Sequence, residues 1–182
     1  MNAVIPPSTS HRSIERYNLI VHLRFFTRLF VVLALLIAAP ARSGEVPAAR
    51  NLHSDGLIAN QAGLPILLFY SASYCHYCEA IKAEFLSHMA VDPTYQTRAL
   101  FREVRIDSSA PLVSFDERTT THHRFAGARK ITLVPTMEFV DASGASLAEP
   151  VIGARIPDYY GAYVDQGIND ALKKIQNEHD PS

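Results

Sequence analysis

The stretch ILLFYSASYCHYC, residues 66–78, joins an apolar run to two cysteines that are separated by two residues. The uninterrupted apolar run predicts a strand that is covered on both faces of a sheet. From Cys78 onward, apolar residues recur at helical spacing, which predicts an amphipathic helix. That helix should stop near Val91, because Asp92-Pro93 disfavours its continuation. The cysteines therefore stand at the junction between a buried strand and a helix.

The position of the first thiol favours its ionisation. Cys75 would lie beside the unpaired N–H groups of a helix start, whose partial positive charge stabilises a thiolate. Cys75 is therefore the predicted nucleophile. Cys78, one turn further along and less exposed, is predicted to attack the mixed disulfide that forms at Cys75. His76, between them, would stabilise the thiolate when protonated and make the pair more oxidising.

Three other uses of the two thiols stay open at this point. A structural disulfide would close a loop too small to constrain the unfolded chain much. A metal site would combine the cysteines with His122 and His123, although these pairs lie far apart in sequence and no second Cys-x-x-Cys exists. Two buried cysteines without any chemical role would leave their spacing as a coincidence.

The composition is that of an ordinary globular domain. The chain has 182 residues, of which 48% are hydrophobic, with 17 Lys and Arg against 18 Asp and Glu. This balance leaves no global positive field that would attract a phosphate backbone. We therefore expect no nucleic-acid partner.

The first 41 residues form a separate compositional block. Basic residues precede the uncharged run LFVVLALLIAA at 29–39, and Ala39-Pro40-Ala41 offers a small-x-small cleavage site. The run is shorter than the roughly 20 apolar residues of a membrane helix. We expect a signal peptide over residues 1–41, or alternatively an uncleaved anchor, and hence a periplasmic protein in a compartment that permits disulfides.

The remaining chain is predicted to be a short linker followed by one domain. Residues 42–53 are small and polar and predict the linker, and residues 54–178 predict the domain. Its first further element is expected to be a short helix with Ser54 or Asp55 as its N-cap and Gly63 as its C-cap. The others are a strand at 101–106, a short strand in LVSF at 112–115, a helix capped within 119–121, two strands within 136–152, and a helix at 157–177.

Two motifs resemble the thioredoxin superfamily, and the similarity extends over residues 52–177. ILLFYSASYCHYC is similar to the central strand and active site of that family. ITLVPTMEFVDASG, residues 131–144, is similar to the segment that carries its cis-proline, here Pro135. The two motifs together are far more specific than Cys-x-x-Cys alone.

The resemblance implies a thioredoxin fold, which is an α/β fold with a mixed sheet of four to five strands flanked by helices. The strand at 66–70 would be central, between the strand at 101–106 and the antiparallel hairpin. The resemblance also implies that the Val134-Pro135 peptide bond is cis and lies against the cysteines. There the backbone of Val134 would pair with an extended segment of the substrate.

The chain also departs from the thioredoxin pattern around the cysteines. Tyr74 stands where thioredoxins usually have Trp, and His76-Tyr77 replaces Gly-Pro. Phe69 occupies the position of their buried acidic residue. The resemblance therefore does not imply a carboxylate at this position that would assist the deprotonation of Cys78.

Exported single-domain thioredoxin-like proteins, including the SoxW-like group, show the closest resemblance. FDERTTTHHRF at 115–125 and IGARIPDYYGAYVDQGI at 152–168 have similar counterparts there. The segment 107–130 is too short for the helical domain of DsbA-type oxidases. Similarly, residues 42–74 are too few for the dimerisation domain of DsbC-type isomerases.

Together with the signal-like segment, the cysteine pair and the resemblance predict a periplasmic thiol-disulfide oxidoreductase. We expect it to be a monomer without a bound cofactor or metal. Its partners would be disulfide-bonded protein substrates and a membrane carrier of thiol reductant. We expect it to reduce disulfides. One alternative is a net oxidant, which His76 and Val134 favour. The others are a metal- or cofactor-handling module that uses the same thiols as ligands, and an interaction domain without catalysis.

Overall fold

The computed structural model describes residues 44–153 and 159–179, so the predicted signal peptide over residues 1–41 lies outside the described part. No helix in this part is both long and apolar enough to span a bilayer. The described elements, in chain order, are α2 (Leu52–Ala62), β1 (Ile66–Ser71), α3 (His76–Ile81), η1 (Lys82–Leu86), α4 (Ser87–Val91), α5 (Pro93–Gln96), β2 (Leu100–Arg105), β3 (Pro111–Val113), β4 (Thr119–Thr121), α6 (His122–Ala128), β5 (Thr136–Val140), β6 (Ser146–Ile152) and α7 (Tyr160–His179).

A mixed four-stranded sheet in the order β2-β1-β5-β6 forms the centre of the domain. β1 runs parallel to β2 and antiparallel to β5, and β6 pairs antiparallel with β5. In this register Phe69 of β1 lies between Glu103 of β2 and Met137 of β5. The prediction of a central strand between the 101–106 strand and a hairpin is confirmed.

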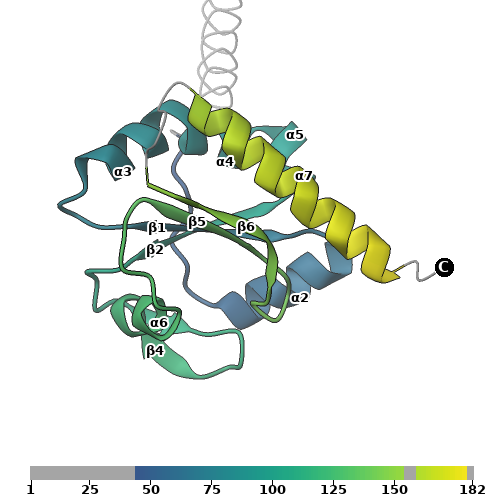
Figure 1. Cartoon of the computed structure of the whole chain (residues 1–182). Coiled ribbons are helices and arrows are strands. Elements are labelled where there is room, and N and C mark those ends of the chain that lie inside the picture. Colours follow the sequence, from purple (N-terminus) through teal and green to yellow (C-terminus); the bar gives the residue numbers. More distant parts are fainter. Residues whose placement is uncertain (1–43, 154–158, 180–182) are drawn as a thin grey trace, which may run out of the picture. The chain divides into compact units, whose positions relative to one another are not determined.

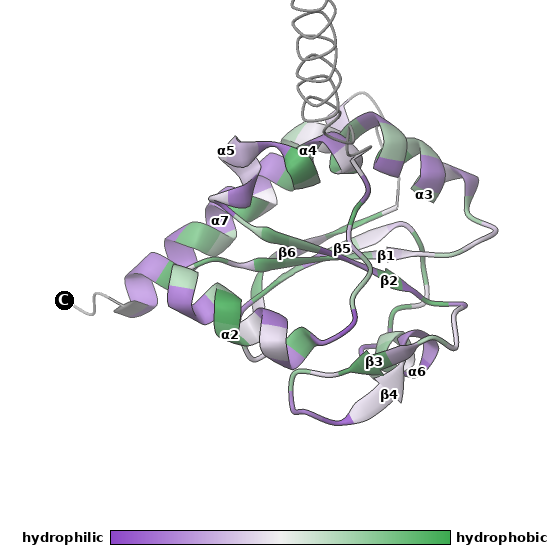
Figure 2. Ribbon diagram, turned by 180° about the vertical axis from the view of Figure 1, so that it is seen from behind, coloured by the Kyte–Doolittle hydropathy of each residue, from purple (hydrophilic) through white to green (hydrophobic). Residues whose placement is uncertain are grey.

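Helices cover both faces of the sheet (Figure 1). α3, η1, α4 and α7 pack on one face, and α2 and α6 pack on the other. Alternate residues of β1 contribute to the two cores: Leu67 and Phe69 to the first, and Ile66, Leu68 and Tyr70 to the second. Figure 2 accordingly shows hydrophobic strands between helices of mixed hydropathy. Burial on both sides explains why β1 is apolar without alternation.

A glycine lets α7 approach the sheet closely. A Cβ atom on Gly167 would come within 2.2 Å of the Phe139 ring on β5. Glycine in a helix interior normally costs about 1 kcal/mol relative to alanine. At this position the cost is offset because any larger residue would displace α7 from the core.

The prediction of a linker at 42–53 is wrong for its described residues. Val46 and Ala49 are 1% and 0% exposed. The segment runs beside β2: the Glu103 N–H donates to the Pro47 carbonyl, and the Ala49 N–H donates to the Glu103 carbonyl, both at 2.8 Å. Small residues and proline are typical of linkers, but they also suit a segment that packs against the edge of a sheet. Residues 44–53 therefore belong to the folded domain.

The first helix begins earlier than predicted. Asn51 caps α2, because its side-chain oxygen accepts the Ser54 N–H at 2.9 Å. Asp55, one of the two predicted caps, instead forms an ion pair with Arg102 of β2. The predicted end at Gly63 is confirmed, with a φ of 65° that glycine adopts without strain.

The segment between β2 and β5 forms a small subdomain. β3 and β4 pair antiparallel in a separate two-stranded sheet. The predicted helix cap is confirmed at Thr121, whose hydroxyl oxygen accepts the Arg124 N–H at 3.3 Å and starts α6. Of the predicted strand at 112–115, the structure retains the first two residues within β3. This subdomain lies against the face of the sheet that α2 covers.

Buried His122 predicts that mild acid destabilises the domain. Burial lowers the pKa of His122, although a hydrogen bond to the Ala49 backbone and the charge of Glu103 act in the other direction. The neutral ring accepts the Arg105 N–H at Nδ1, at 3.1 Å. The folded state binds this proton less readily than the unfolded state, so the contribution of His122 is complete above the ordinary pKa of about 6.5 and is lost as pH falls below it.

Urea unfolding at pH 7.5 and pH 5.0 checks this expectation. His122→Gln should be less stable than the wild type at pH 7.5, yet lose less stability between the two pH values. An equal loss in both proteins would show that another group causes the acid sensitivity.

Candidate active site

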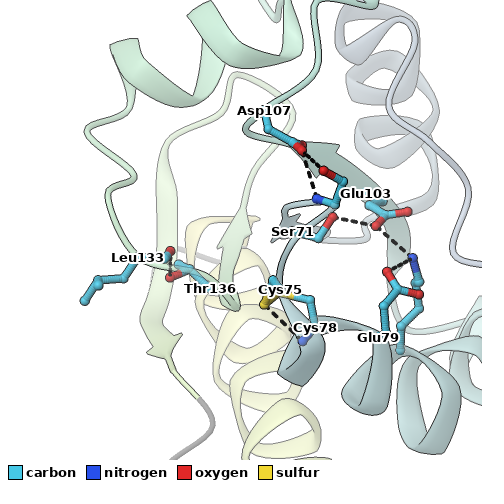
Figure 3. The surroundings of a disulfide bond; sticks show 10 residues. Ser71, Cys75, Cys78, Glu79, Glu103, Asp107, Leu133 and Thr136 are labelled. Atoms are coloured by element: carbon cyan, nitrogen blue, oxygen red, sulfur yellow. Dashed lines mark hydrogen bonds and ion pairs between the residues drawn. A yellow bond between two sulfur atoms is a disulfide. The ribbon is translucent and has the colours of Figure 1, made fainter.

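The two cysteines form a disulfide at the start of the helix that follows β1 (Figure 3). Cys75 is the N-cap of α3, and its Sγ accepts the Cys78 N–H at 3.1 Å. Cys75 is 9% exposed and Cys78 is 0% exposed. Cys75 therefore keeps a small accessible surface and Cys78 has none, in the order that the sequence predicted for nucleophile and resolving thiol.

A carboxylate at the end of β2 anchors the turn before the cysteines. Asp107 Oδ2 accepts the Ser73 backbone N–H at 2.9 Å and also the Ser73 hydroxyl. These hydrogen bonds lower the pKa of Asp107. The Ile106 N–H also donates to the Ser71 carbonyl at 2.8 Å. The turn that presents Cys75 is thus tied to the neighbouring strand at two points.

Pro135 lies at the same end of β1 as the disulfide. The Val134-Pro135 peptide bond is cis, as the resemblance implied. Thr136 pairs with Tyr70, and one further step of this antiparallel register brings Pro135 opposite the last residue of β1. Pro135 is buried, and partly buried Val134 packs against the core cluster that contains both cysteines. Figure 3 shows this segment facing the start of α3, where the two cysteines lie.

Exposed side chains lie on the two segments that carry the disulfide and the cis-proline. Tyr74, Tyr77 and Leu133 are 74%, 63% and 63% exposed. His76 is also exposed and meets the Tyr77 ring edge-on, with 6.2 Å between ring centroids. The predicted supporting residues Tyr74 and His76 therefore face solvent next to Cys75, where a docking polypeptide would touch them.

The structure does not assemble the metal site that was considered as an alternative. His122 Nδ1 accepts a backbone N–H from Arg105, and His123 Nδ1 lies 2.7 Å from the Ile106 carbonyl oxygen. Within residues 44–153 and 159–179, no group of three His, Cys, Asp or Glu side chains could hold a metal ion. The histidines secure the end of β2 instead of joining the thiols.

The sequence analysis missed a buried carboxylate on the face of the sheet that α3 and η1 cover. Glu103 is 5% exposed and lies beside Phe69, so strand pairing directs both side chains to the same face. Its Oε1 accepts the Ser71 hydroxyl at 2.6 Å. Phe69 occupies the position on β1 where thioredoxins have their buried acidic residue, and here a buried carboxylate lies beside it on β2.

Lys82, the first residue of η1, contacts this carboxylate. Its Nζ lies 3.2 Å from Glu103 Oε1 and 3.0 Å from Glu79 Oε1. Burial by itself would lower the pKa of Lys82, but the hydrogen bonds to Glu79 and Glu103 and their charges raise it. Lys82 opens the π-helical turn η1, a feature that is frequent at functional sites.

One signal in the sequence could have identified Glu103. The run FREVRI alternates less cleanly than a half-buried strand would, because an acidic residue shares a face with Phe101 in the predicted strand at 101–106. A charged residue at such a position requires a partner. The partner, Lys82, lies 21 residues earlier in the chain, so local periodicity does not reveal it.

Three solved structures are distantly similar to this chain. The structure of oxidised thioredoxin O2 from Arabidopsis thaliana is 16% identical, with a TM-score of 0.46, over 70% of this chain and 97% of that one. The C-terminal domain of DsbD from Neisseria meningitidis, also oxidised, is 16% identical, with a TM-score of 0.43, over 64% of this chain and 89% of that one. A DsbH oxidoreductase is 21% identical, with a TM-score of 0.41, over 75% and 92%.

These structural likenesses are distant, and no curated protein matches the chain. The family model of the thioredoxin-like domain, in contrast, matches residues 55–168, which include both cysteines and the cis-proline. The match spans more than half of the chain, and the strand order and disulfide position agree with it. The chain therefore belongs to the thioredoxin-like family.

Proposed function

We propose that this protein is a periplasmic thiol-disulfide oxidoreductase that reduces disulfides in other proteins. The observation that carries the proposal is the Cys75–Cys78 pair at a helix start, in which Cys75 keeps a small accessible surface and Cys78 has none. A purely structural bridge would gain little stability from such a short loop. The pair is therefore better suited to exchange than to support.

The reaction transfers two electrons from the dithiol to the substrate. The Cys75 thiolate attacks one substrate sulfur, which forms a mixed disulfide, breaks the substrate S–S bond and releases a thiolate that takes up a proton. Cys78 then loses its proton and attacks Cys75 Sγ. The mixed disulfide breaks, the second substrate thiol leaves, and the Cys75–Cys78 disulfide of this structure is formed.

Glu103 is the proposed acceptor for the proton of Cys78. It is a buried carboxylate on the face of the sheet that carries the cysteine pair, and Lys82 and Ser71 hold it in place. Cys78 is fully buried, so water does not reach its thiol directly. A carboxylate inside the core would remove the proton at the moment when Cys78 attacks.

The proposed cellular setting follows from the first 41 residues. Their signal-like composition supports export to the periplasm. A reductase in an oxidising compartment has to be re-reduced, and a membrane carrier of thiol reductant would supply the two electrons. Exposed His76 beside Cys75 favours the second candidate, a net oxidant.

The reduction potential and an insulin-reduction assay test the proposal. We expect a potential close to the thioredoxin value of about −270 mV, together with catalysed reduction of insulin by dithiothreitol. A potential of about −120 mV, the DsbA value, would show that the protein is an oxidant and not a reductase. A protein that neither reduces insulin nor exchanges disulfides with glutathione would refute both.

A further inference from the structure

A groove with a volume of about 660 Å³ lies between β6 and α7, outside the disulfide site. Its walls are the outer residues of β6 and one side of the helix, where Tyr160, Tyr163, Gly167 and Asp170 recur at helical spacing. β6 is the edge strand of the four-stranded sheet, and Figure 1 shows α7 running along it. The volume lies in the range of pockets that bind small molecules or side chains.

The groove is continuous with the proposed substrate site. Gly153 lines one end of it, and the Gly153 N–H donates to the Pro135 carbonyl at 2.8 Å. Ile152, also in the lining, pairs with Thr136, the residue after the cis-proline. A polypeptide that places a disulfide at Cys75 and passes Val134 therefore reaches this groove a few residues further along.

The lining combines apolar surface with a hydroxyl that lacks a partner. Ile152 and Tyr163 are large side chains with 43% and 41% exposure. Tyr160 is 1% exposed, and its hydroxyl forms no hydrogen bond with any described residue. A buried hydroxyl without a hydrogen bond is unfavourable. A bound group that accepts a hydrogen bond from it would remove this cost.

The charge of the lining selects a cationic partner. Glu149 and Asp170 line the groove, and no lysine or arginine of the described residues does so. Lys173 pairs with Asp170 at 3.6 Å from outside the lining, and Glu149 is exposed. The groove therefore presents carboxylates at the edge of an apolar surface.

We propose that this groove binds the substrate polypeptide beside its reacting disulfide, and that it selects an extended segment with a bulky apolar residue and a neighbouring Lys or Arg. The proposal rests on the proposed function, because that function makes the occupant a disulfide-bonded protein. Edge strand and helix receive the apolar side chain, Glu149 pairs with the cation, and Tyr160 donates to a backbone carbonyl of the segment.

Peptide binding to the oxidised full chain tests the groove without any redox step. The probe is a fluorescein-labelled ten-residue peptide with leucine and arginine beside a serine that stands in for cysteine, and fluorescence anisotropy gives its Kd. Glu149→Lys should weaken binding about fivefold. Glu178→Lys makes the same charge change on α7 outside the groove lining and should leave Kd unchanged. A peptide with glutamate in place of arginine should bind more weakly to the wild type.

Tyr160→Phe provides a second variant that does not depend on charge. It removes the unpaired hydroxyl, so thermal stability should stay equal or rise, while peptide affinity falls about threefold. Equal Kd values for wild type, Glu149→Lys and Tyr160→Phe, or no binding by the wild type, would overturn the proposal that the groove binds the substrate polypeptide.

Reduction of 5,5′-dithiobis(2-nitrobenzoic acid), a small disulfide that does not fill the groove, tests the proposed function separately in the same proteins. Normal reduction of this compound without peptide discrimination refutes the groove alone. Peptide discrimination without any disulfide exchange refutes the proposed function and leaves the groove as a site for basic apolar peptides.

Discussion

Replacing Cys78 with alanine is expected to abolish turnover and to leave Cys75 joined to its substrate in a mixed disulfide. Cys78 is fully buried in the first turn of α3, where its sulfur is bonded to that of Cys75. Without it the second exchange step has no nucleophile, so turnover should fall by roughly a thousandfold or more. Non-reducing electrophoresis of cell extracts should then show disulfide-linked adducts, which disappear when dithiothreitol reduces them.

Cys75→Ser is the matched control for this trap. The variant keeps the fully buried thiol of Cys78 and removes the more accessible thiol of Cys75, so it should neither turn over nor capture a substrate. With 5,5′-dithiobis(2-nitrobenzoic acid), the reduced wild type should release two thionitrobenzoate ions, Cys78→Ala one, and Cys75→Ser none at a comparable rate. Capture by Cys75→Ser as efficient as capture by Cys78→Ala would reverse the assignment of the two thiols.

Replacing Glu103 with glutamine is expected to slow resolution of the mixed disulfide about tenfold at pH 7. Glutamine retains the shape and can still accept from Ser71, but it cannot take up the proton of Cys78. The first thionitrobenzoate release, which reports attack by Cys75, should keep its rate. The second, which reports Cys78, should become slower and rise with pH toward the ordinary thiol pKa of about 8.5.

Glu79→Gln is the control for the charge around Lys82. It removes the other carboxylate that contacts Lys82, but the Glu79 side chain is 60% exposed, whereas that of Glu103 is 6% exposed. Both phases should therefore stay close to wild type. If Glu79→Gln slows the second phase as much as Glu103→Gln does, the effect comes from Lys82 and not from a proton acceptor. Unchanged kinetics in Glu103→Gln would remove Glu103 from the mechanism.

Breaking the Glu103–Lys82 pair also has a cost in stability. Glu103→Gln leaves Lys82 with Glu79 as its one remaining carboxylate contact among the described residues. Removing one partner of a buried ion pair destabilises a protein by a few kcal/mol, and a partly exposed lysine reduces that loss. Kinetic comparisons therefore need the folded fraction of each variant, measured by urea unfolding, to be the same.

The sequence predicted the parts of the site that depend on local patterns. The apolar run of β1, the helix from Cys75 to Val91 and the cap at Thr121 follow from periodicity and capping, which act over a few residues. The cis-proline followed from the family resemblance, because a motif was similar and not because proline alone implies it. The failures at the linker and at the first cap concern residues whose partners lie on β2.

By itself, the sequence determined the redox pair: two cysteines two residues apart, at a junction that periodicity alone places between strand and helix. The tertiary structure alone decided what surrounds the pair. The parallel pairing of β1 with β2 places Glu103 beside Phe69, Lys82 of η1 contacts Glu103 where the helical segment packs on the sheet, and the groove lies between α7 and β6. These contacts join residues far apart in the chain, and their free energy is gained only when the sheet and its helices pack together, so no local pattern encodes them.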